Sequence, residues 1–214
     1  MSEPCREQLH TGIAQLGLNL DQAAEQKLLD YLTLLVKWNR TYNLTAIRDE
    51  KAMVSQHLLD SLVVLPYLNA TSDQNQTIAD VGSGAGLPGI PLAIAEPRLQ
   101  MALIESSQKK AGFLRQVKIE LGLINVSVHC VRIQDYKPVQ TFHAVITRAF
   151  SSLADFVLRS EHILAAGGHL LAMKGVYPQQ EINGLPPGWH VSESLPLVVP
   201  ELSAQRNLIV IEKS

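Results

Sequence analysis

The sequence predicts an α/β fold in which a mostly parallel sheet carries an antiparallel hairpin at its end and follows a small helical segment. Three observations support this prediction. Apolar residues recur at helical spacing through the first 69 positions. From residue 77 onward, short strand-like runs alternate with helical runs, which is typical of a parallel sheet with helices on both faces. Two final strand-like runs are joined without room for a helix, so they are expected to pair as a hairpin.

Length and composition predict a soluble globular chain with one main domain and a small appendage. The 214 residues are 46% hydrophobic and 18% charged. We expect a helical segment over residues 1–69, packed on a ligand-binding domain over residues 70–214. No apolar run reaches the ~18 residues of a membrane span, and the N-terminus lacks the apolar stretch of a signal peptide. A cytoplasmic protein without a membrane partner is therefore expected. The two cysteines have no metal-ligand spacing, so no metal is expected.

The first 69 residues predict three amphipathic helices. The first ends at Gly17, and the second starts after Asp21, a plausible N-cap. The third runs through Met53–Val63 and is expected to close at Pro66. Residues 69–76 are polar and form a connector into the first strand.

The remaining elements follow in alternation. Strands are expected at residues 78–81, 101–105, 126–131, 144–147 and 169–173, with the hairpin strands at 189–199 and 206–212. Helices are expected at 109–121 and 153–164. A turn at Gly167-Gly168 is expected to separate the second of these helices from the fifth strand.

A glycine-rich turn follows the first strand. Gly82, Gly84 and Gly86 stand at alternate positions, where glycine permits a positive φ and lets a ligand approach the backbone closely. Leu87 stands where a dinucleotide fingerprint would place its third glycine. The pattern D-x-G-x-G-x-G, which begins at Asp80, resembles motif I of the class I S-adenosylmethionine-dependent methyltransferases. That resemblance implies their Rossmann-like fold and S-adenosylmethionine as cofactor.

Residues that follow the other strands are candidates for the same site, because ligands of open α/β sheets lie over the carboxyl ends of the strands. Glu105 ends the second strand, where an acid usually meets ribose hydroxyls. Ribose occurs in nicotinamide cofactors as well, so Glu105 does not choose between them, and a solvated strand end is the alternative. Gln134 follows the third strand and could meet an adenine amino group. Arg148 follows the fourth and could hold a cofactor carboxylate or a substrate phosphate, unless it forms a surface salt bridge.

The loop after the fourth strand limits the chemistry. It lacks the D/N-P-P-Y/F sequence that holds an exocyclic amine, and residues 147–150 include no Cys, His or Lys. The acceptor should therefore be nucleophilic without deprotonation, as guanine N7 is. Proximity and in-line orientation should provide most of the acceleration, so we nominate no catalytic residue.

Basic residues gather locally although the net charge is −2. A general nucleic-acid binder would usually be basic, but a local patch can provide the phosphate contacts. For any single lysine, a solvated helix face is the alternative. The candidate track comprises Lys37, Arg40, Arg48, Lys51, Lys109, Lys110, Arg115, Lys118, Arg148, Lys174 and Arg206.

Several segments together resemble the ribosomal RNA small subunit methyltransferase G family, also called glucose-inhibited division protein B. They are W-N-R-T-Y-N-L-T from Trp38, H-L-L-D-S-L from His57, D-V-G-S-G-A-G-L-P-G-I-P from Asp80, R-A-F from Arg148 and R-N-L from Arg206. The resemblance implies N7-methylation of a guanine in the 530 loop of 16S ribosomal RNA, near the decoding centre. The small ribosomal subunit or its precursor would be the partner, and we expect a monomer.

The same resemblance implies that the cofactor is held at Gly82, Leu87, the pair Ile133-Gln134, and Arg148. The family commonly has an acid at the position of Gln134; a glutamine carbonyl can still accept from the adenine amine, and Asp135 could take that role instead. His57 and Asp60 lie three apart on one helix face. They could pack the N-terminal helices over the cofactor, meet the target guanine, or form a structural pair.

Two functions from other classes remain open at this level. One is an NAD-dependent oxidoreductase on a Rossmann-like fold, which the missing third glycine and the terminal hairpin disfavour. The other is a non-catalytic RNA-binding module, which the intact glycine loop and Arg148 disfavour.

Overall fold

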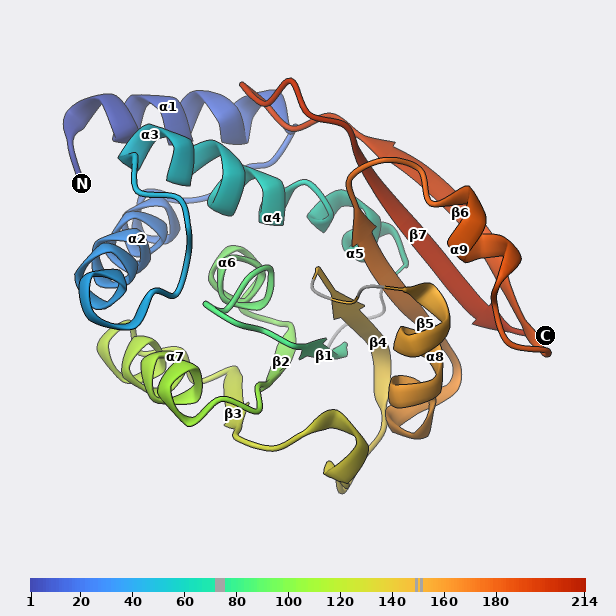
Figure 1. Ribbon diagram of the computed structural model, residues 1–214. Helices are drawn as coiled ribbons and strands as arrows, with labels where there is room; N and C mark the ends of the chain where they lie inside the picture. The colour runs from blue at the N-terminus through green and yellow to red at the C-terminus, as the bar shows by residue number, and fades with distance from the viewer. Residues whose placement is uncertain (72–75, 149, 151) are drawn as a thin grey trace.

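A computed structural model describes residues 1–71, 76–148, 150 and 152–214. Its described strands form one seven-stranded sheet in the order β3-β2-β1-β4-β5-β7-β6 (Figure 1). The strands are β1 (Thr77–Val81), β2 (Gln100–Ile104), β3 (Val126–His129), β4 (Phe142–Thr147), β5 (Leu164–Lys174), β6 (Trp189–Leu197) and β7 (Arg206–Lys213). Strands β1 to β5 are parallel, whereas β7 runs antiparallel to both β5 and β6. The predicted mostly parallel sheet with an antiparallel terminal hairpin is confirmed.

Helices cover both faces of the sheet, because successive side chains of each strand point to opposite faces. Ile78 of β1 packs into a large core with the N-terminal helices, while the neighbouring Ala79 packs into a smaller core on the other face. The helices of the larger core are α1 (Glu3–Gln15), α2 (Gln22–Tyr42), α3 (Glu50–Met53), α4 (Asp60–Leu62), α5 (Leu65–Thr71), α6 (Gly89–Ala95) and α7 (Gln108–Glu120). The smaller core lies under α8 (Leu153–Ser160), with α9 (Gln179–Asn183) at its edge.

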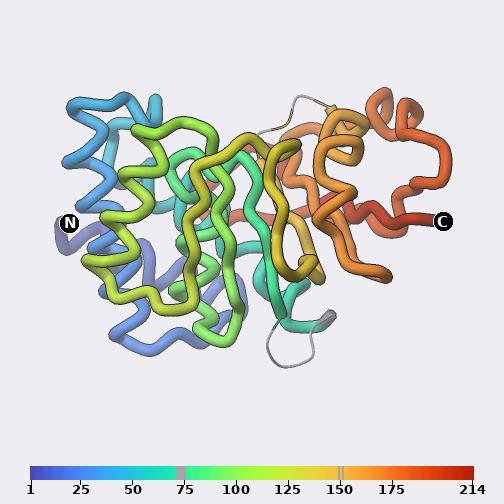
Figure 2. The backbone as a smooth tube through the Cα atoms, turned by 90° about the horizontal axis from the view of Figure 1, so that it is seen from below, coloured from blue at the N-terminus to red at the C-terminus, as the bar shows by residue number. Residues whose placement is uncertain are grey.

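The ends of the chain lie on opposite sides of the molecule, as Figures 1 and 2 both show. The loop between β6 and β7 nevertheless returns to the first helix. Gln8 donates a hydrogen bond to a carboxylate oxygen of Glu201 over 2.6 Å and another to the Lys51 carbonyl over 3.2 Å. The terminal hairpin therefore touches the N-terminal segment as well as the sheet.

The helices of the N-terminal segment begin and end at residues that favour helix caps. The side chain of Asp21 accepts a hydrogen bond from the Ala24 amide over 2.7 Å, which confirms it as the N-cap of α2. Asn43 ends that helix in the left-handed conformation at φ 50°. Gly17, at φ 68°, follows α1 in the same conformation. In the described part of the chain, no helix is both long and apolar enough to cross a membrane.

The third helix differs from the prediction in type. Between α3 and α4 the chain forms a six-residue π-helix, η1 (Val54–Leu59), within what the periodicity presents as one amphipathic helix. A π-helix keeps roughly the same apolar face over so short a run, so the sequence pattern does not reveal it. The predicted end of this region before Pro66 is confirmed, because α4 ends at Leu62. Pro66 then lies in the first turn of a new helix, α5, where its missing N–H costs nothing. Of the predicted connector, residues 72–75 lie outside the described residues.

The predicted turn at Gly167-Gly168 was wrong. Both glycines lie within β5, which begins at Leu164, while α8 ends at Ser160 and gives way to a 3₁₀ turn, η3 (Glu161–Ile163). Gly167 has φ 72° and the register against β4 shifts near it, so the pair marks an irregularity inside the strand. Helix α9 was not predicted from the sequence.

Candidate functional site

A cavity of about 280 Å³ lies over the carboxyl ends of β1 and β2 and the loop after β3. This cavity, called here the first cavity, contains four of the predicted cofactor residues: Gly82, Glu105, Ile133 and Gln134. Its other lining residues are Val81, Ile104, Ser106, Val131, Arg132, Phe150 and Arg159. The parallel sheet brings these segments together because all of its strand ends meet at one edge.

The glycine loop bends sharply at this edge. Gly82, Gly84 and Gly86 have φ values of 73°, 58° and 92°, a region that side chains with a Cβ rarely adopt. The Gly82 amide donates to the Ile104 carbonyl over 2.9 Å, which holds the loop to the end of the neighbouring strand β2. The backbone of Gly82 thus forms part of the cavity wall with no side chain to fill it.

Glu105 links the glycine loop to the start of α7. One of its carboxylate oxygens accepts from the Gly84 amide over 2.9 Å, and the other accepts from the Ser107 amide over 2.8 Å. Its side chain is buried, so the alternative of a solvated strand end was wrong. Each oxygen retains a lone pair, and Glu105 also lines the cavity, so a ligand hydroxyl could still donate to it.

Asp80 is fully buried beneath the glycine loop. Its Oδ2 accepts from the Gly89 amide over 3.0 Å, but its Oδ1 has no hydrogen-bond partner among the described residues. Burial raises the pKa of Asp80 to about 7, although the Gly89 hydrogen bond and the charge of Arg148 act in the opposite direction. Asp80 does not line the first cavity, so its carboxylate supports the glycine loop from beneath through the Gly89 amide.

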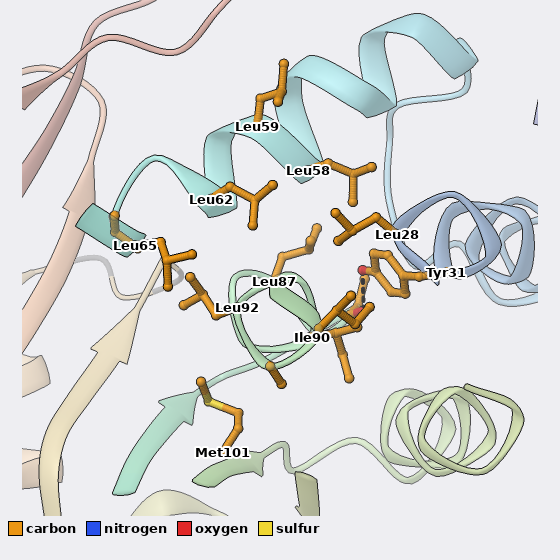
Figure 3. Packing of buried hydrophobic residues seen from close by; sticks show 14 of the residues in the cluster. Leu28, Tyr31, Leu58, Leu59, Leu62, Leu65, Leu87, Ile90, Leu92 and Met101 are labelled. Carbon is orange, nitrogen blue, oxygen red and sulfur yellow. Dashed lines mark hydrogen bonds between the residues drawn. The ribbon is translucent and has the colours of Figure 1, made fainter. Parts of the chain in front are cut away.

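Leu87 does not line the first cavity. Its side chain is buried among leucines of the N-terminal helices, including Leu28, Leu58 and Leu62 (Figure 3). The structure therefore places Leu87 in the apolar core beneath the loop. Gln134 lines the cavity and its neighbour Asp135 does not, within a single 3₁₀ turn, η2 (Ile133–Asp135).

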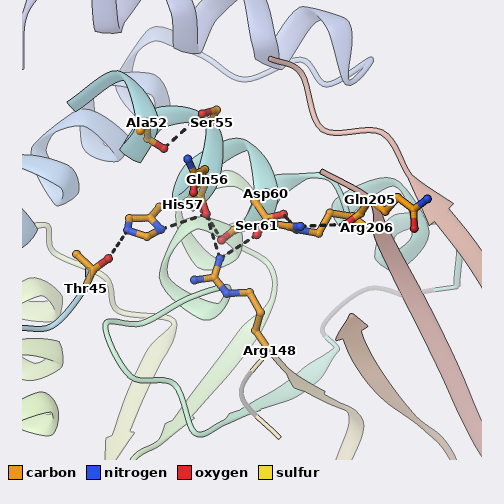
Figure 4. A network of polar contacts seen from close by, with 10 residues as sticks. All are labelled: Thr45, Ala52, Ser55, Gln56, His57, Asp60, Ser61, Arg148, Gln205 and Arg206. Carbon is orange, nitrogen blue, oxygen red and sulfur yellow. Dashed lines mark hydrogen bonds and ion pairs between the residues drawn. The ribbon is translucent and has the colours of Figure 1, made fainter. Parts of the chain in front are cut away.

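Arg148 extends away from the first cavity toward the π-helix (Figure 4). Its Nη1 donates to the Gln56 carbonyl over 3.2 Å and to Asp60 Oδ2 over 3.0 Å. The Asp60 side chain is only 2% exposed, so the alternative of a surface salt bridge was wrong. Through its charge, Arg148 also lowers the pKa of both Asp80 and His57.

His57 and Asp60 do not form the structural pair that their spacing suggested. The Nε2 of His57 is 2.9 Å from the hydroxyl of Thr45, whereas Asp60 Oδ1 accepts from Arg206 Nε over 2.6 Å (Figure 4). Burial, assisted by the charge of Arg148, lowers the pKa of His57 to about 4, so this imidazole is neutral at pH 7. The π-helix gives the two side chains different partners.

Tyr31 contributes to the site although it was not predicted to do so from the sequence. Its hydroxyl donates to the carbonyl of Ala85 in the glycine loop over 2.8 Å, and the whole side chain is buried (Figure 3). Tyr31 lies among the apolar residues on one face of α2, where a tyrosine is usually interpreted as a core residue. A buried tyrosine hydroxyl needs a hydrogen-bond partner, and this need could have indicated that Tyr31 contacts another segment.

The residues of the basic track fall into two groups. Arg148 and Arg206 are paired with Asp60, and Lys174 is paired with Glu181 over 2.8 Å. By contrast, several lysines and arginines of α2 and α7 are exposed on neighbouring helices that contact through Trp38 and Phe113, whose rings lie 5.6 Å apart. The exposed group comprises Lys37, Arg40, Lys109 and Arg115.

Comparison with known proteins gives consistent results. The model of the rRNA small subunit methyltransferase G family matches residues 24–210. The ribosomal RNA small subunit methyltransferase G of Aromatoleum aromaticum is 53% identical over 96% of this chain and 98% of its own length. The protein of the same name from Chromobacterium violaceum is 53% identical over 94% and 95% of the two chains.

Solved structures with much lower identity share the fold. An S-adenosylmethionine-dependent methyltransferase from Thiobacillus denitrificans, solved with S-adenosyl-L-homocysteine, is 11% identical with a TM-score of 0.58, covering 85% of this chain and 98% of that one. TrmN from Thermus thermophilus is 15% identical with a TM-score of 0.56, covering 75% and 53%. These likenesses concern the fold alone.

Proposed function

Because the chain belongs to the rRNA small subunit methyltransferase G family, we propose that it transfers the methyl group of S-adenosylmethionine to N7 of a guanine in the 530 loop of 16S ribosomal RNA. The observation that carries this proposal is the 53% identity over almost the whole length of two relatives with that name. The choice of N7 and of the 530 loop follows from the family resemblance and from the lack of amine-activating residues after β4.

The residues of the first cavity fit the cofactor. Gly82 offers a backbone wall without a side chain, and Glu105 offers a carboxylate for ribose hydroxyls. Ile133 and Gln134 would frame the adenine. Asp80 lies beneath the glycine loop, outside the cavity lining, and would support the loop through the Gly89 amide. Arg148 does not line this cavity; its Nη1 is bound to Gln56 and Asp60, so it would hold the cofactor carboxylate through its remaining N–H groups. Leu87 would support the loop from the core, because its side chain does not reach the cavity.

S-adenosylmethionine supplies an electrophilic methyl group attached to a positively charged sulfur. The protein then has to bring the acceptor nitrogen into line with that methyl group and exclude water. A neutral guanine N7 carries a lone pair, so no base is needed. His57 would be a weak base, since its pKa is lowered to about 4 and its Nε2 is hydrogen-bonded to Thr45, so it is not assigned that role. Positive charge moves during the transfer and does not newly appear, so electrostatic stabilisation is a smaller contribution than in acyl transfer.

The proposal includes a monomeric enzyme in the cytoplasm, where small ribosomal subunits are assembled. The exposed cations of α2 and α7 would contact RNA phosphates, since they are not neutralised by acids as Arg206 and Lys174 are. Light scattering during size-exclusion chromatography tests the monomer, with and without RNA.

The decisive experiment is transfer of a labelled methyl group from S-adenosylmethionine to naked 16S RNA, small subunits and whole ribosomes, followed by mapping of the product base. We expect 7-methylguanine in at least one substrate. Methylation of an exocyclic amine, or none in any substrate, would refute the assignment.

Calorimetric titration with S-adenosylhomocysteine and with NAD tests the cofactor separately. We expect binding of the first alone, and loss of that binding in Gly82→Val, whose new side chain would enter the cofactor's path from a backbone at positive φ. Binding of NAD in preference to S-adenosylhomocysteine would favour the oxidoreductase.

A further inference from the structure

A second cavity, of about 250 Å³, lies on the other side of Arg148. It opens between the carboxyl ends of β4 and β5, the start of β7 and the π-helix. We call it the Asp60 cavity. Its lining comprises Ile47, Gln56, His57, Asp60, Arg148, Met173, Lys174, Gly175 and Arg206. The cofactor residues of the first cavity are absent from this lining, so the two cavities are separate spaces.

The two cavities are nevertheless adjacent. The loop after β4 contributes Phe150 to the first cavity and Arg148 to the Asp60 cavity, two residues apart. Strand β4 also pairs in parallel with β1, and the Thr147 hydroxyl at its end donates to the Val81 carbonyl over 2.8 Å, so the start of the Arg148 loop lies beside the start of the glycine loop. A group held in the Asp60 cavity therefore lies beside the place where a methyl donor at the glycine loop would present its methyl group.

The lining suits a flat, polar, uncharged ring. Ile47 and Met173 provide apolar surface of the kind against which a base packs. Its volume is below the ~300–1,000 Å³ of pockets for drug-sized ligands, which suits a single base. A phosphate is a poor occupant, because the buried Asp60 carboxylate would repel it. The three cations of the lining are already paired, Arg148 and Arg206 with Asp60 and Lys174 with Glu181.

Asp60 is the distinctive group in this lining. Each of its oxygens accepts one hydrogen bond from an arginine, Oδ2 from Arg148 and Oδ1 from Arg206, which fixes the plane of the carboxylate. A carboxylate has about four acceptor positions, so about two remain. Guanine is the base that presents two adjacent donors, N1–H and the 2-amino group, on its Watson–Crick edge, and its N7 lies on the opposite side of the ring.

We propose that the Asp60 cavity receives the target guanine, flipped out of the RNA, and that Asp60 accepts hydrogen bonds from its N1–H and 2-amino groups. This inference rests on the proposed function and adds to it the residue that selects the base. Enzymes that act on a base commonly take it out of the stack and recognise its Watson–Crick edge. With that edge on Asp60, N7 is left free to face the methyl donor. Adenine, cytosine and uracil each lack the pair of neighbouring donors, so the same carboxylate would reject them.

The first test uses the unaltered enzyme and RNA in which inosine replaces the mapped target guanine. Inosine keeps N7, O6 and N1–H but lacks the 2-amino group, so one hydrogen bond to a charged acceptor is lost. We expect kcat/KM for methyl transfer to fall roughly 10- to 100-fold. Equal rates with guanine and inosine would overturn the assignment. Failure of the proposed function would appear differently, as no 7-methylguanine in the unmodified RNA.

The second test uses Asp60→Asn, with Asp30→Asn on α2 as the matched control. Asp30 accepts from Gln26 within its own helix and lines neither cavity. We expect Asp60→Asn to lose at least about tenfold in kcat/KM with guanine RNA and to lose the preference for guanine over inosine, while it still binds S-adenosylhomocysteine. The control should match the wild type in kcat/KM with guanine RNA, in the preference for guanine over inosine and in S-adenosylhomocysteine binding.

Parallel loss of S-adenosylhomocysteine binding and methyl transfer in Asp60→Asn would show that Asp60 acts through Arg148 on the cofactor, which would overturn the proposal. An unchanged preference for guanine in the variant would also overturn it. If Asp60→Asn does not fold, the inosine measurement on the wild-type enzyme decides the question alone.

Discussion

At the scale of single residues, the site depends on buried polar groups whose partners come from distant parts of the chain. Asp80 follows an apolar run, so its position at the end of β1 could be predicted from the sequence, but its missing partner could not. Tyr31 and Ala85 are 54 positions apart, and Arg148 and Asp60 are 88 apart. Such pairs depend on how the N-terminal helices dock on the sheet, which no local pattern encodes.

Asp80 leads to a prediction about stability and pH. Its pKa is raised by burial to about 7 in the folded protein, above its value in the unfolded chain. The folded state therefore binds more protons between about pH 4 and pH 7, and the free energy of unfolding falls as the pH rises through this window. Asp80→Asn removes this dependence. We expect the free energy of unfolding of the variant, relative to the wild type, to rise by about 2–3 kcal/mol from pH 5 to pH 8.

Urea unfolding of both proteins at the two pH values measures this difference, since the other titrating groups are common to both. The variant should also bind S-adenosylhomocysteine more weakly, because the Asp80 charge is lost. A pH dependence identical in the two proteins would mean that Asp80 titrates normally.

Tyr31 gives a second prediction at this scale. Tyr31→Phe keeps the buried ring but leaves the Ala85 carbonyl of the glycine loop without its donor. We expect the free energy of unfolding to fall by about 1–3 kcal/mol. We also expect the KM for S-adenosylmethionine to rise, because the loop is held less firmly, with little change in the KM for RNA. A rise in the KM for RNA alone would contradict the assigned role.

At the scale of elements, the strand ends were the most predictable part of the site. Gly82, Glu105, Ile133 and Gln134 were chosen because they follow strands, and all four line the first cavity. The rule fails where a residue turns into the core, as Leu87 does, or where a lining residue comes from a helix, as Arg159 of α8 does. Phe150 lies three residues after the end of β4 and could have been found by the same rule.

The π-helix was the least predictable element, since its apolar face imitates that of an α-helix. It nevertheless carries Gln56 and His57 and ends just before Asp60, so it forms one wall of the Asp60 cavity. Helices of this kind are frequent at functional sites. Gly12 of α1 lies directly against Leu59 at its end, which sets how closely α1 can approach.

Gly12→Ala tests that contact. A Cβ at this position would overlap the side chain of Leu59, a buried residue that cannot move away freely. We expect the free energy of unfolding to fall by about 1–3 kcal/mol from overpacking. Gly112→Ala in α7 is the matched control, because nothing lies within 4 Å of its added Cβ. There the higher helix propensity of alanine should raise the free energy of unfolding by about 0.5–1 kcal/mol. Urea unfolding measures both, and a stabilised Gly12→Ala would refute close packing of α1 on the π-helix.

At the scale of the whole molecule, the helical segment and the sheet share one core. Residues from α1, α2 and η1 pack in the same apolar cluster as residues from β1, β2 and α7. The mostly parallel sheet and its terminal hairpin could be predicted from the alternation of elements, whereas no strand order was predicted. The docking of the N-terminal helices could not be predicted. The apolar face of an amphipathic helix indicates that the helix packs on another element, but it does not indicate which element.

This shared core predicts that the N-terminal segment and the sheet unfold together, and the two tryptophans of the chain can test it. Trp38 in α2 packs on Phe113 of α7, and Trp189 is buried at the start of β6, at the other end of the molecule. In Trp189→Phe the remaining fluorescence reports on the N-terminal segment, and in Trp38→Phe it reports on the hairpin. Within each variant, we expect the fluorescence transition in urea to coincide with that of far-ultraviolet circular dichroism, as two-state unfolding requires. A fluorescence transition of Trp38 at lower urea than the circular dichroism of the same variant would show that residues 1–69 unfold as a separate unit.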